Sequence, residues 1–79
     1  MNREEILSKL HDIYVEVLEL DELTLTEATT ASDIDEWDSL SHIELIDAIE
    51  REFGVKFKSK EVMDWNNVGD IITSIAQKK

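Results

Sequence analysis

The chain has 79 residues, and its 19 Asp and Glu against 8 Lys and Arg give a formal net charge of −11. A chain this short buries only about 60% of the surface that it exposes when unfolded, which excludes a second hydrophobic core and a deep catalytic cleft. It contains no Cys, so disulfides, thiolate zinc sites and a catalytic thiol are excluded as well. We therefore expect residues 1–79 to form one acidic domain that is not an enzyme.

Charge and hydropathy also narrow the partners and the location. A strongly negative surface repels the phosphate backbone, so we expect no nucleic-acid partner. No apolar run approaches the roughly 20 residues of a spanning helix, and no basic segment precedes an apolar one as in a signal peptide. We expect no membrane insertion, and predict a monomer in the cytoplasm.

The acidic residues are concentrated in one part of the chain. Between Asp12 and Glu50 there are 13 acidic residues and no Lys or Arg, whereas residues 51–79 carry 6 basic and 4 acidic ones. Solubility alone is one explanation of such a run. An unrelieved anionic helix face repels itself, however, so its presence favours the steering of a basic partner. The later series Lys56, Lys58 and Lys60 is interpreted as a solvated connector, with a second partner contact as the alternative.

The first segment has the spacing of an amphipathic helix. Its apolar residues recur at steps of three, four and seven: Ile6, Leu7, Leu10, Ile13, Tyr14, Val17 and Leu18. Asn2 can cap this helix, and Glu4 and Glu5 favour the positive end of its dipole. The pattern predicts a helix from about Asn2 to Leu20.

A long loop follows, from Leu20 to Asp38. The helical period is lost there and Thr, Asp and Glu dominate, while a few apolar residues recur at intervals. We expect these residues to point inward: Leu23, Leu25, Ala28 and Ile34. Loops of this length in a compact domain are usually functional or disordered.

The second helical segment has a broader apolar face than the first, so we expect it to be the most buried helix. Its apolar residues are Leu40, Ile43, Leu45, Ile46, Ala48, Ile49 and Phe53. Gly54 predicts its C-terminal end, because Gly enters the left-handed conformation without penalty. Val55 and Phe57 then alternate with lysines, which predicts an extended connector that plugs the core.

Two further helices complete an all-α prediction. Ser59 can cap a one-turn helix over Lys60 to Asp64, which would place Val62 and Met63 toward the second helix. The last helix has Val68, Ile71, Ile72, Ile75 and Ala76 at helical spacing, is capped by Asn66 or Asn67, and ends at Lys78 and Lys79. We predict a four-helix bundle with three longer helices, a short third helix, and a long loop between the first two.

Catalytic signatures are absent from the sequence. His11 and His42 fall on different predicted helices and follow no catalytic motif, so both are interpreted as surface or boundary residues.

The segment from Asp33 to Glu44 has the outline of a calcium loop, with Asp35 at the third position and Glu44 at the twelfth. Trp37 occupies a ligand position and Asp38 replaces the turning Gly, so we expect no specific metal site. Loose binding of divalent cations to the acidic surface remains an open alternative.

One joint stands out, where the acidic loop meets the second helix with Asp38-Ser39-Leu40. One interpretation is that Asp38 and Ser39 only cap the helix. The other is that Ser39 carries a phosphodiester, because the positive dipole end and open N–H donors of a helix start favour a phosphate.

The sequence resembles the acyl carrier protein family, small acidic carriers that hold a phosphopantetheine arm on a serine at the start of the second helix. The resemblance covers nearly the whole chain and rests on the order of the helices and on Asp38-Ser39-Leu40, with Ile43-Glu44-Leu45, Glu52-Phe53 and Asn67-Val68-Gly69-Asp70-Ile71 in support. It implies the acyl-carrier four-helix fold and 4′-phosphopantetheine as a covalent cofactor on Ser39.

The resemblance also implies partners. A phosphopantetheinyl transferase would modify Ser39, with a Mg²⁺ ion held partly by Asp38. Acyl-loading and acyl-transferring enzymes with basic patches would then meet the face formed by Asp38, Leu40, Glu44, Asp47 and Glu50. The cargo would be acyl thioesters of fatty acid, polyketide or surface-lipid biosynthesis.

Alternatives stay open at this point. In one alternative, a long apolar cargo folds back into a space lined by Leu40, Ile43, Val62 and Met63. In the other, the core is closed and has no space for a cargo. The same Ser39 would serve an aminoacyl or peptidyl carrier, although the acidic second helix favours acyl cargo. A third alternative is an acidic helical adaptor that carries nothing, in which Ser39 is only a cap.

Overall fold

The computed structural model describes residues 2–78, and these contain helices and no strand. The elements in chain order are α1 (Arg3–Val17), a 3-10 turn η1 (Ala31–Asp33), α2 (Ser39–Phe53), α3 (Ser59–Asp64) and α4 (Val68–Lys78). Three longer helices, a short third helix and a long loop between the first two are the architecture that the sequence predicts. The predicted end at Lys79 lies outside the described residues. Within them, no helix is long and apolar enough to cross a membrane.

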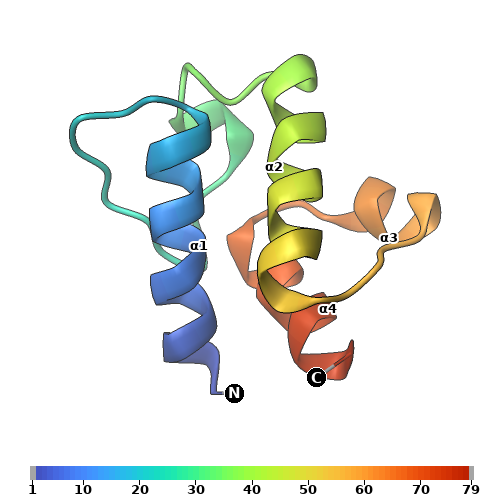
Figure 1. Cartoon of the computed structure of the whole chain (residues 1–79). Coiled ribbons are helices and arrows are strands. Elements are labelled where there is room, and N and C mark those ends of the chain that lie inside the picture. The colour runs from blue at the N-terminus through green and yellow to red at the C-terminus, as the bar shows by residue number, and fades with distance from the viewer. Residues whose placement is uncertain (1, 79) are drawn as a thin grey trace.

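α1 lies at the centre of the packing. It runs antiparallel to α2, and it contacts both α2 and α4 (Figure 1). One cluster of buried side chains joins these three helices and the loop: Ile6, Leu10, Ile13, Tyr14, Leu18, Leu25, Ile34, Trp37, Leu45, Ile49, Phe53, Val68, Ile71, Ile72 and Ile75. α3 contributes no buried residue and follows the connector that leaves the C-terminal end of α2 (Figure 1).

α1 ends three residues before the predicted Leu20. Its start is as expected, since the Asn2 side chain accepts from the Glu5 N–H at 2.8 Å. At the other end Glu19 is left-handed, with φ of 54°, and the Leu20 N–H returns to the Val15 carbonyl at 3.0 Å. This is a Schellman-type stop, which periodicity does not reveal because Leu18 is still buried against the core.

α2 is not the most buried helix, contrary to expectation. Only Leu45, Ile49 and Phe53 are buried on it, while Leu40 and Ile43 are 73% and 66% exposed. The shorter α4 has four buried residues. The breadth of the apolar face of α2 therefore reflects residues at its start that face solvent.

The loop from Leu18 to Asp38 is docked on the helices. Leu25 and Ile34 are buried as predicted. The prediction for Ala28 is wrong, because Ala28 is exposed and its neighbour Thr29 is buried. Thr29 Oγ1 accepts from the Thr26 N–H at 3.0 Å, so a polar residue occupies the inward position through a local turn.

The segment after α2 is the extended connector that the sequence predicts. Gly54 is left-handed, with φ of 66°, and Val55 and Phe57 are half-buried against the core. α3 begins at Ser59 with Lys58 as its N-cap residue, so the prediction of Ser59 as the cap is wrong.

The side chains of α3 and the start of α4 also differ in part from expectation. Val62 is half-buried, but Met63 is 83% exposed and faces solvent rather than α2. Asn67 caps α4, because its Oδ1 accepts from the Asp70 N–H at 3.0 Å. Asp70 in turn accepts from the Asn66 N–H at 2.8 Å.

Candidate functional site

α2 begins with a hydrogen-bonded cap in which Ser39 takes no part. Asp38 Oδ1 accepts from the backbone N–H groups of Leu40 (3.0 Å) and Ser41 (2.9 Å). Ser41 Oγ accepts from the Asp38 N–H (2.8 Å) and donates to the Glu36 carbonyl (2.9 Å). The Ser39 side chain is exposed, and its hydroxyl has no hydrogen-bond partner within residues 2–78. Asp38 is confirmed as a cap, whereas the interpretation of Ser39 as one is wrong.

The cap also keeps the Asp38 carboxylate ionised. The backbone N–H and then the hydroxyl of Ser41 lower the pKa of Asp38 below its ordinary value of 3.8, and the Leu40 N–H adds to this effect. Among the described residues nothing hydrogen-bonds Asp38 Oδ2. The start of α2 therefore places a negative oxygen that a cation can bind next to an unbonded hydroxyl.

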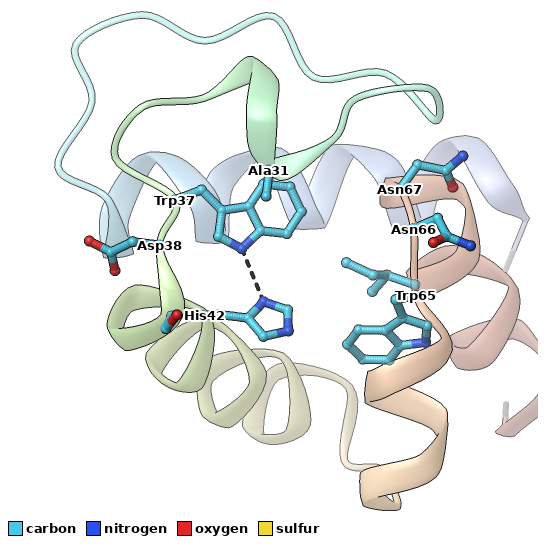
Figure 2. Close-up of a pocket in the computed structure, with 9 residues that line it drawn as sticks. Ala31, Trp37, Asp38, His42, Trp65, Asn66 and Asn67 are labelled. Atoms are coloured by element: carbon cyan, nitrogen blue, oxygen red, sulfur yellow. Dashed lines mark hydrogen bonds between the residues drawn. The ribbon is translucent and has the colours of Figure 1, made fainter.

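A pocket of about 380 Å³ opens beside Ser39. Trp37, Asp38, Ser39 and His42 line it from the loop and α2, and Trp65 with Asn66 and Asn67 lines it from the junction of α3 and α4 (Figure 2). Its two sides come from segments more than 20 residues apart in the sequence.

Aromatic side chains form the walls of this pocket. The Trp37 ring packs edge-on against Tyr14, with centroids 5.0 Å apart, and its indole N–H donates to His42 Nδ1 at 3.0 Å (Figure 2). The His42 ring meets Trp65 edge-on at 6.2 Å, and Trp65 meets Phe57 at 5.0 Å. This series of rings links α1 through α2 to the connector.

His42 is held neutral in one tautomer. Partial burial lowers the pKa of His42 below its ordinary value of 6.5. Because Nδ1 accepts from Trp37, the proton of the neutral ring is on Nε2. The sequence interpretation of His42 as a boundary residue agrees with its half-buried position, but its bond to Trp37 has no sequence signature.

The predicted docking residues are not all on one exposed face. Glu44 is exposed, and so is Asp47, which pairs with Arg51 at 2.8 Å. The Glu50 side chain is only 16% exposed, because its Oε2 accepts from the Phe57 N–H at 2.8 Å. Glu50 thus holds the connector against α2, while Glu44 and Asp47 point outward.

The predicted cargo contacts do not line a described pocket. Leu40, Ile43 and Met63 are among the exposed large hydrophobic residues, and Val62 is half-buried. The residues that do line the pocket beside Ser39 were missed, notably Trp37, His42, Trp65, Asn66 and Asn67. Two tryptophans within an acidic 79-residue chain were a signal for such a site, since aromatic side chains line ligand pockets.

The geometry defines a class of protein, a small helical domain that presents an exposed, unbonded serine hydroxyl at the start of a long helix, where a phosphate is favoured. Comparison with known proteins agrees. The model of the family described as "Phosphopantetheine attachment site" matches residues 8–75. A protein of Thermotoga maritima named acyl carrier protein is 39% identical over 77 residues, which cover 98% of this chain and 95% of that protein.

Two further comparisons point the same way. An acyl carrier protein of Thermosynechococcus vestitus is 39% identical over 79 residues, covering 99% of this chain and 96% of its own. The solution structure of holo acyl carrier protein from Geobacter metallireducens superposes with a TM-score of 0.86 at 40% identity, covering 91% of this chain and 83% of that one.

The chain belongs to the acyl carrier protein family, within the phosphopantetheine-attachment family. This confirms the predicted family, the predicted fold and 4′-phosphopantetheine as the covalent cofactor. The protein is a carrier on which other enzymes act rather than a catalyst, and those enzymes include a phosphopantetheinyl transferase and acyl-handling enzymes. Membership of this family excludes the third alternative, an acidic helical adaptor that carries nothing.

Proposed function

We propose that Ser39 is the residue to which 4′-phosphopantetheine is attached. The single observation that carries this proposal is that the Ser39 hydroxyl is exposed and unbonded, while Asp38 and Ser41 satisfy the helix start. A phosphodiester at this position lies at the positive end of a 15-residue helix, where a negative charge is stabilised.

Asp38 has a second role in the attachment reaction. Its ionised Oδ2 is available to hold a Mg²⁺ ion that accompanies coenzyme A. In the transferase, the Ser39 hydroxyl would lose its proton to a base of that enzyme as its oxygen forms a bond to the phosphorus that carries pantetheine. The pyrophosphate bond of coenzyme A would break, and the nucleotide part would leave with the bridging oxygen. The attached group supplies a thiol that binds acyl groups as thioesters, and the chain has no Cys that could compete for them.

The proposed function is to present acyl thioesters to enzymes of fatty acid, polyketide or surface-lipid biosynthesis. The acyl carrier proteins among its relatives support acyl cargo. An aminoacyl or peptidyl carrier is the alternative, since the same serine would serve it. Tethering raises the local concentration of the cargo at each active site without tight binding. We also propose that residues 1–79 act as a single carrier domain, which the one contiguous core supports, and that the protein is a monomer in the cytoplasm.

Docking on partner enzymes is proposed to use the start and outer face of α2. Asp38, Leu40, Glu44 and Asp47 are exposed there, and Glu50 contributes its charge from a more enclosed position. Exposed apolar Leu40 and Ile43 lie among these carboxylates, so a partner patch of Lys and Arg around an apolar centre is complementary. Such docking should weaken as salt rises.

Intact mass measurement tests the attachment site. The protein is incubated with coenzyme A and a broad-specificity phosphopantetheinyl transferase, together with Ser39→Ala and the matched control Ser41→Ala. A single phosphopantetheine increment is expected for the wild type and for Ser41→Ala, and none for Ser39→Ala. An unchanged wild-type mass, or an increment that persists in Ser39→Ala, would refute the proposal.

A further inference from the structure

The end of α2 and the connector after it are cationic in an otherwise acidic protein. Residues 12–50 have no Lys or Arg, whereas residues 51–60 have four of the eight in the chain against one carboxylate. We call these four exposed residues the cationic surface: Arg51, Lys56, Lys58 and Lys60. Solubility does not explain this surface, because it brings the net charge of −11 closer to zero.

The connector holds its lysines outward in a fixed position. Phe57 packs against the core, and successive side chains of an extended segment point to opposite sides, so Lys56 and Lys58 on either side of it face solvent. The Phe57 N–H donates to Glu50 Oε2 at 2.8 Å, and its ring meets Trp65 edge-on at 5.0 Å. A surface that is already held in place loses less entropy when a partner binds.

The protein itself makes little use of these lysines. Lys58 and Lys60 form no ion pair within residues 2–78, and Lys56, which is 90% exposed, lies 3.9 Å from Glu50. The other three Lys and Arg of the described chain, by contrast, pair with carboxylates of other segments: Arg3 with Glu27, Lys9 with Glu52 and Lys78 with Glu61. The lysines of the connector are therefore available to another molecule.

The outward stripe of α2 changes sign along its length. Leu40, Glu44, Asp47 and Arg51 are spaced by four, three and four residues, which places them on one face of the helix. Arg51 Nη2 lies 2.8 Å from Asp47 Oδ2 and compensates its charge. A 15-residue helix is about 22 Å long. Because the screening length is only about 8 Å at physiological ionic strength, the acidic start and the cationic end act as separate charges.

This separation indicates the kind of partner that fits. An anionic membrane or a nucleic acid is an extended negative surface, and a protein with a net charge of −11 is repelled from it as a whole. The surface of another protein is finite and can have patches of both signs. A basic patch opposite Asp38 and Glu44 would attract the carrier, and an acidic patch opposite the cationic surface would complete the contact.

We propose that the cationic surface is a second docking contact, continuous with the outer face of α2, and that it fits partner enzymes with an acidic patch beside their basic one. The inference rests on the proposed function, namely docking through α2. Two contacts of opposite sign favour a single alignment of α2, since the reversed alignment brings like charges together. Enzymes with a uniformly basic patch are disfavoured for the same reason, so this surface determines which partners the carrier serves.

Charge exchange between carrier and enzyme tests the contact. The probe is a condensing enzyme that elongates acyl chains and docks carriers through a patch of Lys and Arg. Each of these basic residues is replaced by Glu in turn, and KM and kcat are measured for the acylated holo protein and its variant Lys56→Gln/Lys58→Gln. The control Ser8→Glu/Thr24→Glu lowers the net charge by the same amount at exposed positions on α1 and the long loop. Figure 1 shows these two elements and α3 on opposite sides of α2.

The expected result is a reversal of sign. With the unmodified enzyme, Lys56→Gln/Lys58→Gln should lower KM, because repulsion from the basic patch is relieved. With Glu at a position far from the entrance of the active site, the same variant should raise KM, because it loses an attraction. Exposed charge pairs change affinity by about two- to fivefold. The kcat value should not change, and the control should respond alike to both enzymes.

The outcomes separate this contact from the proposals on which it rests. Intact mass checks loading on every sample, and an unchanged mass refutes the attachment, with which the second contact also falls. If Glu44→Gln leaves KM unchanged, docking through α2 is refuted. If Glu44→Gln raises KM but no Glu position of the enzyme reverses the effect of Lys56→Gln/Lys58→Gln, the second contact alone is overturned. Binding to vesicles of phosphatidylglycerol and phosphatidylcholine in equal parts, lost in that variant, would assign the surface to a membrane instead.

Discussion

The starts of α2 and α4 are capped alike but covered differently. Asp38 caps α2 by accepting from the Ser41 N–H at 2.9 Å, and Asn67 caps α4 by accepting from the Asp70 N–H at 3.0 Å. At α4 the long loop covers the next groups, since the N–H groups of Val68 and Gly69 donate to loop carbonyls at 2.9 and 2.8 Å. At α2 no loop carbonyl within the described residues takes this position, and Ser39 faces solvent.

The difference shows how one fold separates stability from function. The covered start of α4 joins the loop to the core, and a Cβ at Gly69 would make a tight contact with Glu27. The open start of α2 has a cap that holds the helix while the adjacent hydroxyl stays accessible to another enzyme. Changes at the covered start should therefore affect folding, and changes at the open start should affect modification.

Breaking the covered start should have the largest effect on stability. A Cβ at Gly69 would lie 3.0 Å from the Glu27 carbonyl oxygen and 3.3 Å from the Glu27 Cβ, so Gly69→Val forces the loop away from α4. Overpacking of this kind costs about 1–3 kcal/mol, measurable by urea denaturation. Gln77→Ala, at an exposed position of α4, is the control. A Gly69→Val variant as stable as the wild type would show that the loop is not held there.

Removal of the Asp38 cap at the open start should lower stability by less than Gly69→Val does. Asp38→Ala loses the two hydrogen bonds to the N–H groups of Leu40 and Ser41, and the melting temperature of a domain this size should fall by roughly 4–8 °C. Asp38→Asn keeps an acceptor oxygen, so its melting temperature should fall by much less. Differential scanning calorimetry of both variants would contradict the expectation if Asn and Ala had equal effects.

Acidification sharpens the same comparison. Since Ser41 and Leu40 lower the folded-state pKa of Asp38 below 3.8, its charge contributes stability that is present above the unfolded pKa and is lost as the pH falls through the folded pKa. The stability advantage of the wild type over Asp38→Asn should therefore shrink below about pH 4. An advantage that is independent of pH would show that the charge of Asp38 does not matter to the cap.

Salt should act mainly on the half of the chain that holds the open start. Residues 12–50 carry acidic side chains and no Lys or Arg, so their mutual repulsion is relieved when salt shortens the screening length. We expect the melting temperature to rise by a few degrees along a NaCl series, and more steeply with MgCl₂. A flat or falling series would show that self-repulsion is not significant.

Periodicity predicted α1, α2 and α4 because each of these helices buries one stripe of side chains, such as Ile71, Ile72 and Ile75 on α4. The short α3 buries no side chain, and its prediction came from the capping pattern instead. Periodicity failed where local backbone geometry decides, as at Glu19, whose left-handed conformation ends α1 early. It also failed in the loop, where Thr29 rather than Ala28 is buried, since a turn without a period hides which residue points inward.

The candidate site was only half predictable for a different reason. Asp38 and Ser39 are adjacent in the sequence, and a helix start is a local feature that sequence reveals. The pocket beside them needs His42, which packs against Trp37, to meet Trp65, and a contact between segments more than 20 residues apart has no local signature. Glu50 was predicted only as a docking charge, and its bond to the Phe57 N–H adds a structural role as a support for the connector.

The smallest expected effect on stability belongs to the residue that matters most for function. Ser39→Ala removes a hydroxyl with no bond within residues 2–78, and such exposed substitutions usually change stability by less than about 0.5 kcal/mol. The variant should therefore melt with the wild type in calorimetry while it loses all modification by the transferase. If Ser39→Ala were clearly destabilised, the hydroxyl would have a structural role, and lost modification could no longer be assigned to a missing attachment point. A stable variant without modification would show that the hydroxyl at the open start is kept for attachment alone.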